Sequence, residues 1–254
     1  MKRLGIILTL IFCLVTSVFG ADKSLKKVQE KGYFIVGLDD TFAPFGFRDE
    51  NGELVGYDID LAKEVAKRMG VEARFKPCEW DGILFELKSK KVDMVWNGMS
   101  ITESRKKQAA FSKPYEEGRQ IIFTLKGKRI DKVEELEGKI VGVQLGSTGD
   151  FAIQKSPIFS KIKEVKKYGT LIESIMDLEA GRIDAVVAAQ TAGGYYNSKK
   201  QNLEMSSETV MQGDASGVAF RKEDNKLREA VDKALDDIKA DGTFQNIYSK
   251  WFGK

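Results

Sequence analysis

The sequence predicts an α/β protein of two lobes, each built around a mostly parallel β-sheet. Short apolar runs alternate with segments whose apolar residues recur at helical spacing, which is the pattern of βαβ units. This alternation continues up to Trp96 and starts again near Lys139. The chain has 254 residues, of which 42% are apolar, and this suits a globular protein of one or two domains.

In the first series, strands are expected at residues 33–36, 71–78 and 93–96. A helix between the first two strands carries Leu61 and Val65 on its inner face. The expected helix boundaries are Asp58 or Asp60 as the cap of this helix, Gly70 as its end, and Asp81 as the start of the next.

The second series has the same character. The expected strands are 140–143, 164–168, 184–188 and 217–221, and the expected helices are one from Asp150 after the turn 146–149, then 171–179, 224–240 and 242–252. The polar stretch Lys113–Gly118 precedes a strand at 119–125, so we expect the boundary between the lobes there.

The N-terminal residues have the pattern of a secretory signal. Lys2 and Arg3 precede an apolar run over residues 4–18, and small residues stand before Ala21, which predicts cleavage after Gly20. The alternative is a membrane anchor, but the run is shorter than the ~20 residues that a span requires. Segment 1–20 is therefore expected to direct the protein to the periplasm.

Composition excludes several classes of function. Histidine is absent, which rules out His-based acid–base catalysis, Ser-His-Asp triads and His-ligated metal sites. Cys13 lies inside the apolar run behind Phe12, which does not suit lipidation, and its loss would leave Cys78 without a partner. Removal of Lys2 and Arg3 takes the formal charge from +3 to +1, so no nucleic-acid partner is expected.

Polar and aromatic residues follow the predicted strands, at the edge where ligands bind in α/β sheets. The candidates are Asp39, Phe42, Trp80, Asn97, Gly98, Ser100, Arg105, Gln144, Ser147 and Thr148. No catalytic residue, metal site or cofactor is predicted among them.

These residue types suit a small anionic ligand. Arg105 can hold a carboxylate through two parallel hydrogen bonds. Ser147 and Thr148 stand at a predicted helix start, where free N–H groups favour an anion. Phe42 and Trp80 can enclose an apolar part. Taken singly, each residue also has a structural interpretation, as a surface ion pair, a core aromatic residue or a turn residue. The glycine-rich turn lacks the Lys-Ser/Thr of a nucleotide-binding loop.

Several motifs in order resemble the polar amino-acid-binding proteins of bacterial ABC importers, solute-binding protein family 3. The resemblance covers essentially the whole chain after the signal segment. The matching segments are 56–61 (GYDIDL), 101–105 (ITESR), 111–115 (FSKPY), 146–149 (GSTG), 184–187 (DAVV) and 251–253 (WFG).

The resemblance implies a two-lobed periplasmic-binding-protein fold with two crossover hinge strands, near residues 115–119 and 212–216. The implied domains are the signal 1–20, a discontinuous first lobe 21–117 and 214–254, and a second lobe 118–213. It also implies a monomer that captures a small polar amino acid or related carboxylate by hinge closure and delivers it to a membrane permease.

Roles for single residues also follow from the resemblance. Arg105 would hold the ligand α-carboxylate, assisted by Ser100 and the Thr148 N–H, and the Gly98 carbonyl would accept from the α-ammonium. Phe42 and Trp80 would flank the ligand side chain, whose identity Asp39, Asn97 and Gln144 would read.

One position departs from the family pattern. Ala189 stands where the family usually has an aspartate that pairs with the ligand ammonium. Gln190, Asp150 and Asp40 are the candidates to replace it, and the other interpretation is a ligand without an α-ammonium. Two further hypotheses use the same fold: a periplasmic sensor, and an enzyme similar to the cyclohexadienyl dehydratases, for which the usual acid position is again Ala189.

Overall fold

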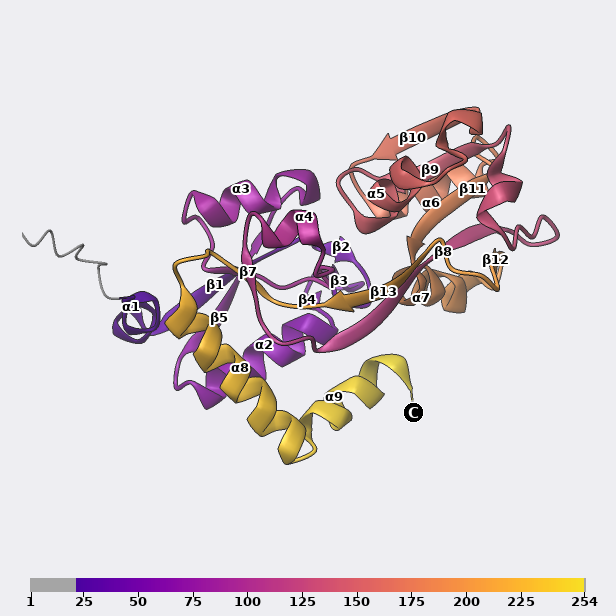
Figure 1. Cartoon of the computed structure of the whole chain (residues 1–254). Coiled ribbons are helices and arrows are strands. Elements are labelled where there is room, and N and C mark those ends of the chain that lie inside the picture. Colours follow the sequence, from indigo (N-terminus) through magenta and orange to yellow (C-terminus); the bar gives the residue numbers. More distant parts are fainter. Residues whose placement is uncertain (1–21, 254) are drawn as a thin grey trace, which may run out of the picture.

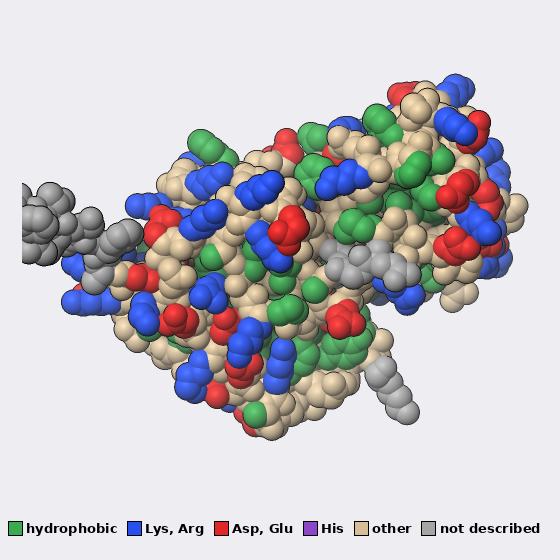
Figure 2. Space-filling model, viewed as in Figure 1, with side chains coloured by type: hydrophobic (Ala, Val, Ile, Leu, Met, Phe, Trp, Pro, Cys, Tyr) green, Lys and Arg blue, Asp and Glu red, His purple; other side chains and the backbone are tan. Residues whose placement is uncertain are grey.

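The computed structural model describes residues 22–253, without the side chains of residues 212–214. The predicted signal segment 1–20, with Cys13 and the cleavage site, lies outside the described residues. No helix within residues 22–253 is long and apolar enough to cross a membrane. On the face in Figure 2, Lys and Arg side chains alternate with Asp and Glu over both lobes, with no large area of one charge.

The first lobe contains a mixed five-stranded sheet with the order β5-β1-β6-β14-β7. Its strands are β1 (Tyr33–Leu38), β5 (Glu72–Pro77), β6 (Met94–Val95), β7 (Ala110–Phe111) and β14 (Ala219–Phe220). Strand β1 pairs in parallel with β5 and β6, while β14 runs antiparallel to its neighbours. The helices of this lobe are α1 (Ser24–Lys31), α2 (Tyr57–Arg68), α3 (Ile83–Lys88), α4 (Glu103–Lys106), α8 (Asn225–Ala240) and α9 (Thr243–Phe252).

The second lobe has a sheet with the order β10-β9-β11-β8-β12, and β13 also pairs with β8. Its strands are β8 (Glu116–Leu125), β9 (Ile140–Gln144), β10 (Glu164–Tyr168), β11 (Ala185–Ala189), β12 (Leu203–Met205) and β13 (Met211–Ser216). Its helices are α5 (Thr148–Lys155), α6 (Leu171–Glu179) and α7 (Gln190–Lys200). A small sheet of β2 (Thr41–Phe42), β3 (Gly46–Arg48) and β4 (Leu54–Val55) completes the strands, and short 3-10 turns lie at Trp80–Gly82, Val133–Leu136 and Phe159–Lys161.

Two strands connect the lobes. In Figure 1, β8 leads from the first lobe to the second, β13 returns beside it in the opposite direction, and α8 and α9 belong to the first lobe. Their pairing joins residues 116–118 to residues 214–216. The predicted lobe boundaries fall within this pair and stay a prediction.

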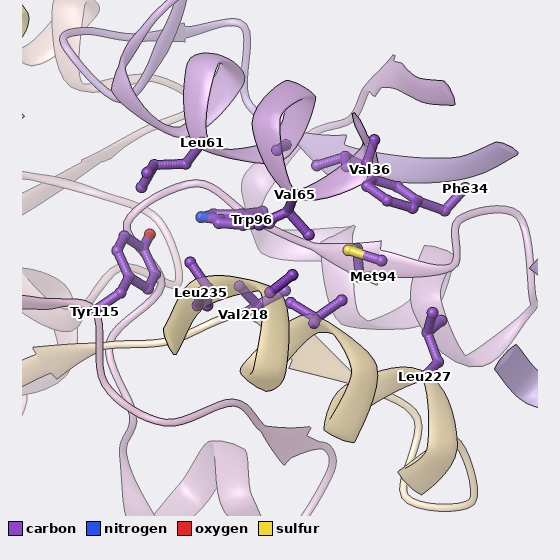
Figure 3. Close-up of a cluster of buried hydrophobic side chains, with 14 of the residues drawn as sticks. Phe34, Val36, Leu61, Val65, Met94, Trp96, Tyr115, Val218, Leu227 and Leu235 are labelled. Atoms are coloured by element: carbon purple, nitrogen blue, oxygen red, sulfur yellow. The ribbon is translucent and has the colours of Figure 1, made fainter. Parts of the chain in front are cut away.

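Each lobe has its own core. In the first, Phe34, Val36, Trp96 and Tyr115 pack with residues of α2 and α8 and are at most 5% exposed. Figure 3 shows the Tyr115 ring beside Trp96, with Val65 above Trp96 and Leu235 below. In the second, two clusters lie on the two faces of the sheet. Two separate cores allow the lobes to move as units about β8 and β13.

The segment Gly56–Leu61 has a structural reason for its composition. Gly56 has φ 147°, and a Cβ there would lie 2.2 Å from the Phe45 carbonyl oxygen, so glycine is required. The prediction that Asp58 or Asp60 caps α2 was wrong, because the N-cap is Gly56 and no side chain caps it. Asp58 instead accepts a hydrogen bond from the Gly98 N–H, and Asp60 accepts one from the Trp251 indole.

Other boundaries differ from the expected ones by a few residues. Helix α5 begins at Thr148, not Asp150, because the Ser147 hydroxyl accepts from the Asp150 N–H as an N-cap. Strand β8 begins at Glu116, inside the stretch taken as a polar boundary. Helices α1 and α7 and the sheet β2–β4 were not predicted.

Two adjacent glycines in α7 should respond oppositely to alanine. A Cβ at Gly193 would lie 2.1 Å from the buried ring of Phe123, whereas the nearest atom to a Cβ at Gly194 is 3.9 Å away. We expect Gly193→Ala to lower the free energy of unfolding by about 1–3 kcal/mol through overpacking. Gly194→Ala should raise it by about 0.5–1 kcal/mol through helix propensity. Urea denaturation of both variants measures this, and equal effects would contradict the packing of α7 on β8.

Candidate functional site

A cavity lies between the two lobes, closed on one side by the crossover strands. It is lined by Phe42, Phe45, Trp80, Gly98, Ser100, Glu116, Gly118, Gln120, Gln144, Ser147, Thr148, Leu171, Val187, Ala188, Ala189, Thr191 and Ser216. The predicted residues Phe42, Trp80, Gly98, Ser100, Gln144, Ser147 and Thr148 are in this set. Asp39, Asn97, Arg105 and Gln190 are not.

Arg105 lies directly behind the cavity wall. It is the third residue of α4, whose N-cap Thr102 accepts from the Arg105 N–H, and it is 4% exposed. Its guanidinium donates to the Ser100 carbonyl (3.1 Å), the Thr148 hydroxyl (3.2 Å) and the Gly146 carbonyl (3.1 Å). The guanidinium carbon also lies 5.6 Å from the Trp80 ring centroid. This cation therefore joins the two lobes at one end of the cavity.

The start of α5 forms the opposite side of that end. Ser147 is the N-cap, and Thr148 is the first residue of the helix. The Thr148 hydroxyl donates to the Ser100 hydroxyl at 2.7 Å, across the two lobes. The free N–H groups of the first helical turn and the nearby guanidinium together favour a negative charge.

Asp39, Asn97 and Gln144 form a second contact between the lobes. The Gln144 amide donates to the Asp39 carboxylate at 2.7 Å, and the Asn97 side chain accepts from the Asp39 N–H at 3.0 Å. All three side chains are at most 5% exposed. Gln144 lines the cavity, and Asp39 and Asn97 lie behind it.

Aromatic rings form one wall. The Phe42 ring stacks on Phe45 at 5.5 Å and on Trp80 at 6.4 Å between centroids, with the planes within 19° of parallel. Sequence reasoning identified Phe42 and Trp80 but not Phe45, which follows Phe42 in the same loop. The rings supply a water-excluding surface for an apolar part of a ligand.

The buried Asp58 holds the Gly98 turn from the side of the first-lobe core. Gly98 has φ 60°, and its N–H lies 2.6 Å from the Asp58 carboxylate, which also accepts from the Tyr115 hydroxyl at 2.9 Å. Burial raises the pKa of Asp58 to about 8, against these hydrogen bonds, which favour the ionised form. The turn that faces the cavity is therefore fixed from the core of the first lobe.

The three residues suggested as replacements for Ala189 do not line the cavity. Gln190 is the first residue of α7 and faces a neighbouring hollow. Asp150 is bonded to the Gly146 N–H and paired with Lys167, each at 3.1 Å. Asp40 pairs with Arg48 at 2.7 Å. Ala189 itself does line the cavity.

Sequence reasoning missed the floor of the cavity. Glu116, Gly118 and Gln120 line it from β8, and Ser216 lines it from β13. Residues 116, 118 and 120 share one face of the strand because side chains alternate. This period of two is present in the sequence, but the polar stretch Lys113–Gly118 predicted a lobe boundary there and not a lining strand. Among the side chains that the structure describes, which exclude those of residues 212–214, no group of three or more from His, Cys, Asp or Glu could hold a metal ion.

The family model for bacterial extracellular solute-binding proteins, family 3, matches residues 34–254. The chain belongs to this family. The L-cystine-binding protein of Escherichia coli strain K12 is 35% identical over 237 residues, covering 92% of this chain and 88% of that protein. The membership confirms the resemblance predicted from the motifs.

Solved structures of amino-acid-binding proteins have the same architecture. An ancestral arginine-binding protein bound to arginine is 45% identical, with a TM-score of 0.83 over 87% of this chain and 99% of that chain. An ancestral amino acid-binding protein described as a precursor of cyclohexadienyl dehydratase is 34% identical, with a TM-score of 0.82 over 90% of this chain and 99% of that one. The predicted two-lobed α/β fold is confirmed.

Proposed function

We propose that this chain captures a free amino acid between its lobes and is the periplasmic binding component of an ABC importer. The observation that carries the proposal is the cavity between the lobes, which combines an anion site with an aromatic wall. Membership of family 3 and the ligands named for its relatives support it.

The anion site suits the ligand carboxylate. Arg105, Ser100 and Thr148 converge from both lobes, and their present contacts with one another are ones that a carboxylate can replace. A guanidinium that binds a carboxylate through two parallel bonds fixes its orientation as well as its position. We therefore assign this end of the cavity to the α-carboxylate.

The aromatic wall and Gln144 suit the ligand side chain. Phe42 and Trp80 cover its apolar part, while the Gln144 amide can meet a polar end. Gln144 is itself oriented by Asp39, behind which lies Asn97. An aromatic wall beside a polar amide suits the side chain of a polar amino acid with an aliphatic stem.

Ligand capture would work through closure of the lobes about β8 and β13. Three hydrogen bonds join the two lobes: Thr148 to Ser100, Gln144 to Asp39, and the Tyr196 hydroxyl to the Thr41 carbonyl (2.7 Å), and separation of the lobes would break them. A ligand held by both lobes favours that form by its differential affinity. A permease that recognises the closed form would then receive loaded protein only. We propose the lobe boundaries at 117/118 and 213/214.

A thermal-shift screen of the purified protein tests the proposal, with the twenty amino acids, cystine, ornithine and simple carboxylic acids as probes. A ligand that binds only the folded state raises the melting temperature, by an amount that grows with concentration above Kd. We expect a strong shift from at least one amino acid. If only a simple carboxylic acid raises the melting temperature, the ligand is a carboxylate that is not an amino acid, and the amino-acid proposal is wrong.

One observation favours a second function, that of an enzyme on the same fold. Glu116 lines the cavity with a pKa raised to about 7, which suits a general acid. Incubation with the bound amino acid separates the two functions: a binding protein returns it unchanged by NMR, whereas an enzyme converts it.

A further inference from the structure

Glu116 places a carboxyl group at the floor of the cavity. It is the first residue of β8, and its side chain is half-buried. Among the described residues that line the cavity, it is the one with an acidic side chain. Because Ala189 brings no charge, Glu116 is the acidic side chain that these lining residues offer to a cationic group of a ligand.

The carboxyl group has no counter-charge in the described part of the chain. No hydrogen bond or ion pair joins the Glu116 side chain to another described residue. Glu116 and Arg119 both line a neighbouring hollow, as Glu117 and Tyr248 do, but they form no ion pair there. Burial raises the pKa of Glu116 to about 7, and the negative charge of the neighbouring Glu117 acts in the same direction. A cation brought by a ligand would stabilise its ionised form.

The backbone register places Glu116 beside the anion site. Ser216 is the register partner of Glu116, and it also forms a bridge with Ser100. The hydroxyl of the preceding residue, Tyr115, accepts a hydrogen bond from the Gly98 N–H at 3.2 Å. Glu116 therefore lies next to the Gly98–Ser100 turn. The ammonium of an α-amino acid is attached to the carbon that carries the carboxylate, so it must lie near this turn.

We propose that the Glu116 carboxylate binds the α-ammonium of the ligand, at the opposite side of the α-carbon from Arg105. This inference rests on the proposed function and narrows it. The ligand is a zwitterionic α-amino acid, recognised at both charges, and a simple carboxylic acid is excluded. The ammonium site is then Glu116 on the crossover strand β8, and not position 189 in the second lobe, where the family pattern places an aspartate.

Glu116→Gln tests this assignment, because glutamine keeps the shape of the side chain and removes its charge. Glu117→Gln is the matched control: it removes the same charge at the next residue, which is exposed and does not line the cavity. The twenty amino acids and cystine are screened by thermal shift, and the tightest binder goes to calorimetry at pH 8. We expect Glu116→Gln to weaken binding roughly 10- to 100-fold, as for loss of a charge-assisted hydrogen bond. Glu117→Gln should stay within about threefold of the wild type.

A second ligand separates recognition from a structural role. The analogue of the tightest binder without its α-amino group should bind the wild type much more weakly than the parent does. Glu116→Gln should discriminate far less between the two. An equal loss for both ligands in the variant would overturn the assignment, as would an unchanged affinity for the parent.

The pH dependence gives an independent readout on the wild type. As pH rises from 6 to 8, Glu116 ionises, so affinity for the parent should rise about 5- to 10-fold relative to the amine-free analogue. Without ligand the sign is reversed: a pKa raised by folding means that stability falls as pH rises through 7. Glu116→Gln should lack the change in the affinity ratio, and its stability should fall less with pH than that of the wild type, because Asp58, with a pKa raised to about 8, still titrates. An affinity ratio that does not change with pH in the wild type would contradict the proposal.

The screen also distinguishes this proposal from the proposed function. If the wild type binds no amino acid, both fall. If it binds one and Glu116→Gln binds it equally well, the function stands and the ammonium site lies elsewhere.

Discussion

Replacing Arg105 by alanine should abolish measurable binding of any carboxylate ligand while the protein still folds. The guanidinium is buried and lies at the end of the cavity where Ser100 and Thr148 meet. Two charge-assisted hydrogen bonds to a carboxylate contribute about 1.5–3 kcal/mol each, so the loss should exceed about 100-fold. Isothermal titration calorimetry measures this directly.

Two further variants control the Arg105 experiment. Arg105→Lys keeps the charge but loses the planar fork, so it should recover only part of the affinity. Lys106→Ala removes the neighbouring cation, which is exposed and pairs with Glu103, and should bind as the wild type does. Affinity retained by Arg105→Ala, with a normal melting curve, would remove Arg105 from the site.

Replacing Asp58 by alanine should both destabilise the first lobe and impair binding. The Asp58 carboxyl accepts from the Gly98 N–H and the Tyr115 hydroxyl, so its loss leaves the buried Tyr115 hydroxyl without an acceptor and the Gly98 N–H with only its 3.2 Å bond to that hydroxyl. A buried donor left unsatisfied costs about 1–3 kcal/mol, which predicts a loss of at least that size in the free energy of unfolding. The Gly98 turn would lose its support, and affinity should fall with it.

Asp60→Ala is the appropriate comparison for Asp58→Ala. Asp60 belongs to the same helix and motif, but its partners are Lys250 and Trp251 in α9, away from the cavity. We expect a modest loss of stability and unchanged affinity at a temperature where the variant is folded. Urea denaturation and calorimetry of both variants check this, and equal effects on affinity would show that Asp58 does not act through Gly98.

The sequence was sufficient for the elements with strong local patterns. Buried apolar strands such as β9 and β11, and helices with a clear apolar face such as α2 and α6, lie close to their predicted positions. Helix α7 was missed because Gly193, Gly194 and two tyrosines give it little intrinsic helix propensity. Its packing on β8, with Gly193 against Phe123, depends on tertiary contacts that no local pattern contains.

The residues of the site, like the elements of the fold, were predicted only where a local pattern marks them. Residues that directly follow strands, such as Trp80, Gly98 and Thr148, were predicted because the carboxyl ends of strands define the edge. The crossover strands were predicted as hinges but not as the floor of the cavity, since Glu116 and Ser216 belong to a pair formed by residues about a hundred positions apart. The capping role expected of Asp58 was wrong for a related reason: its partner, Gly98, lies forty positions away.

A crystal structure of the protein with the amino acid that gives the largest thermal shift would test the central claim most directly. The account predicts one ligand molecule between the lobes, with its carboxylate on the Arg105 guanidinium and the Thr148 N–H and its side chain against Phe42 and Trp80. An amino acid bound outside this cavity, or within it with its carboxylate away from Arg105, would contradict the account.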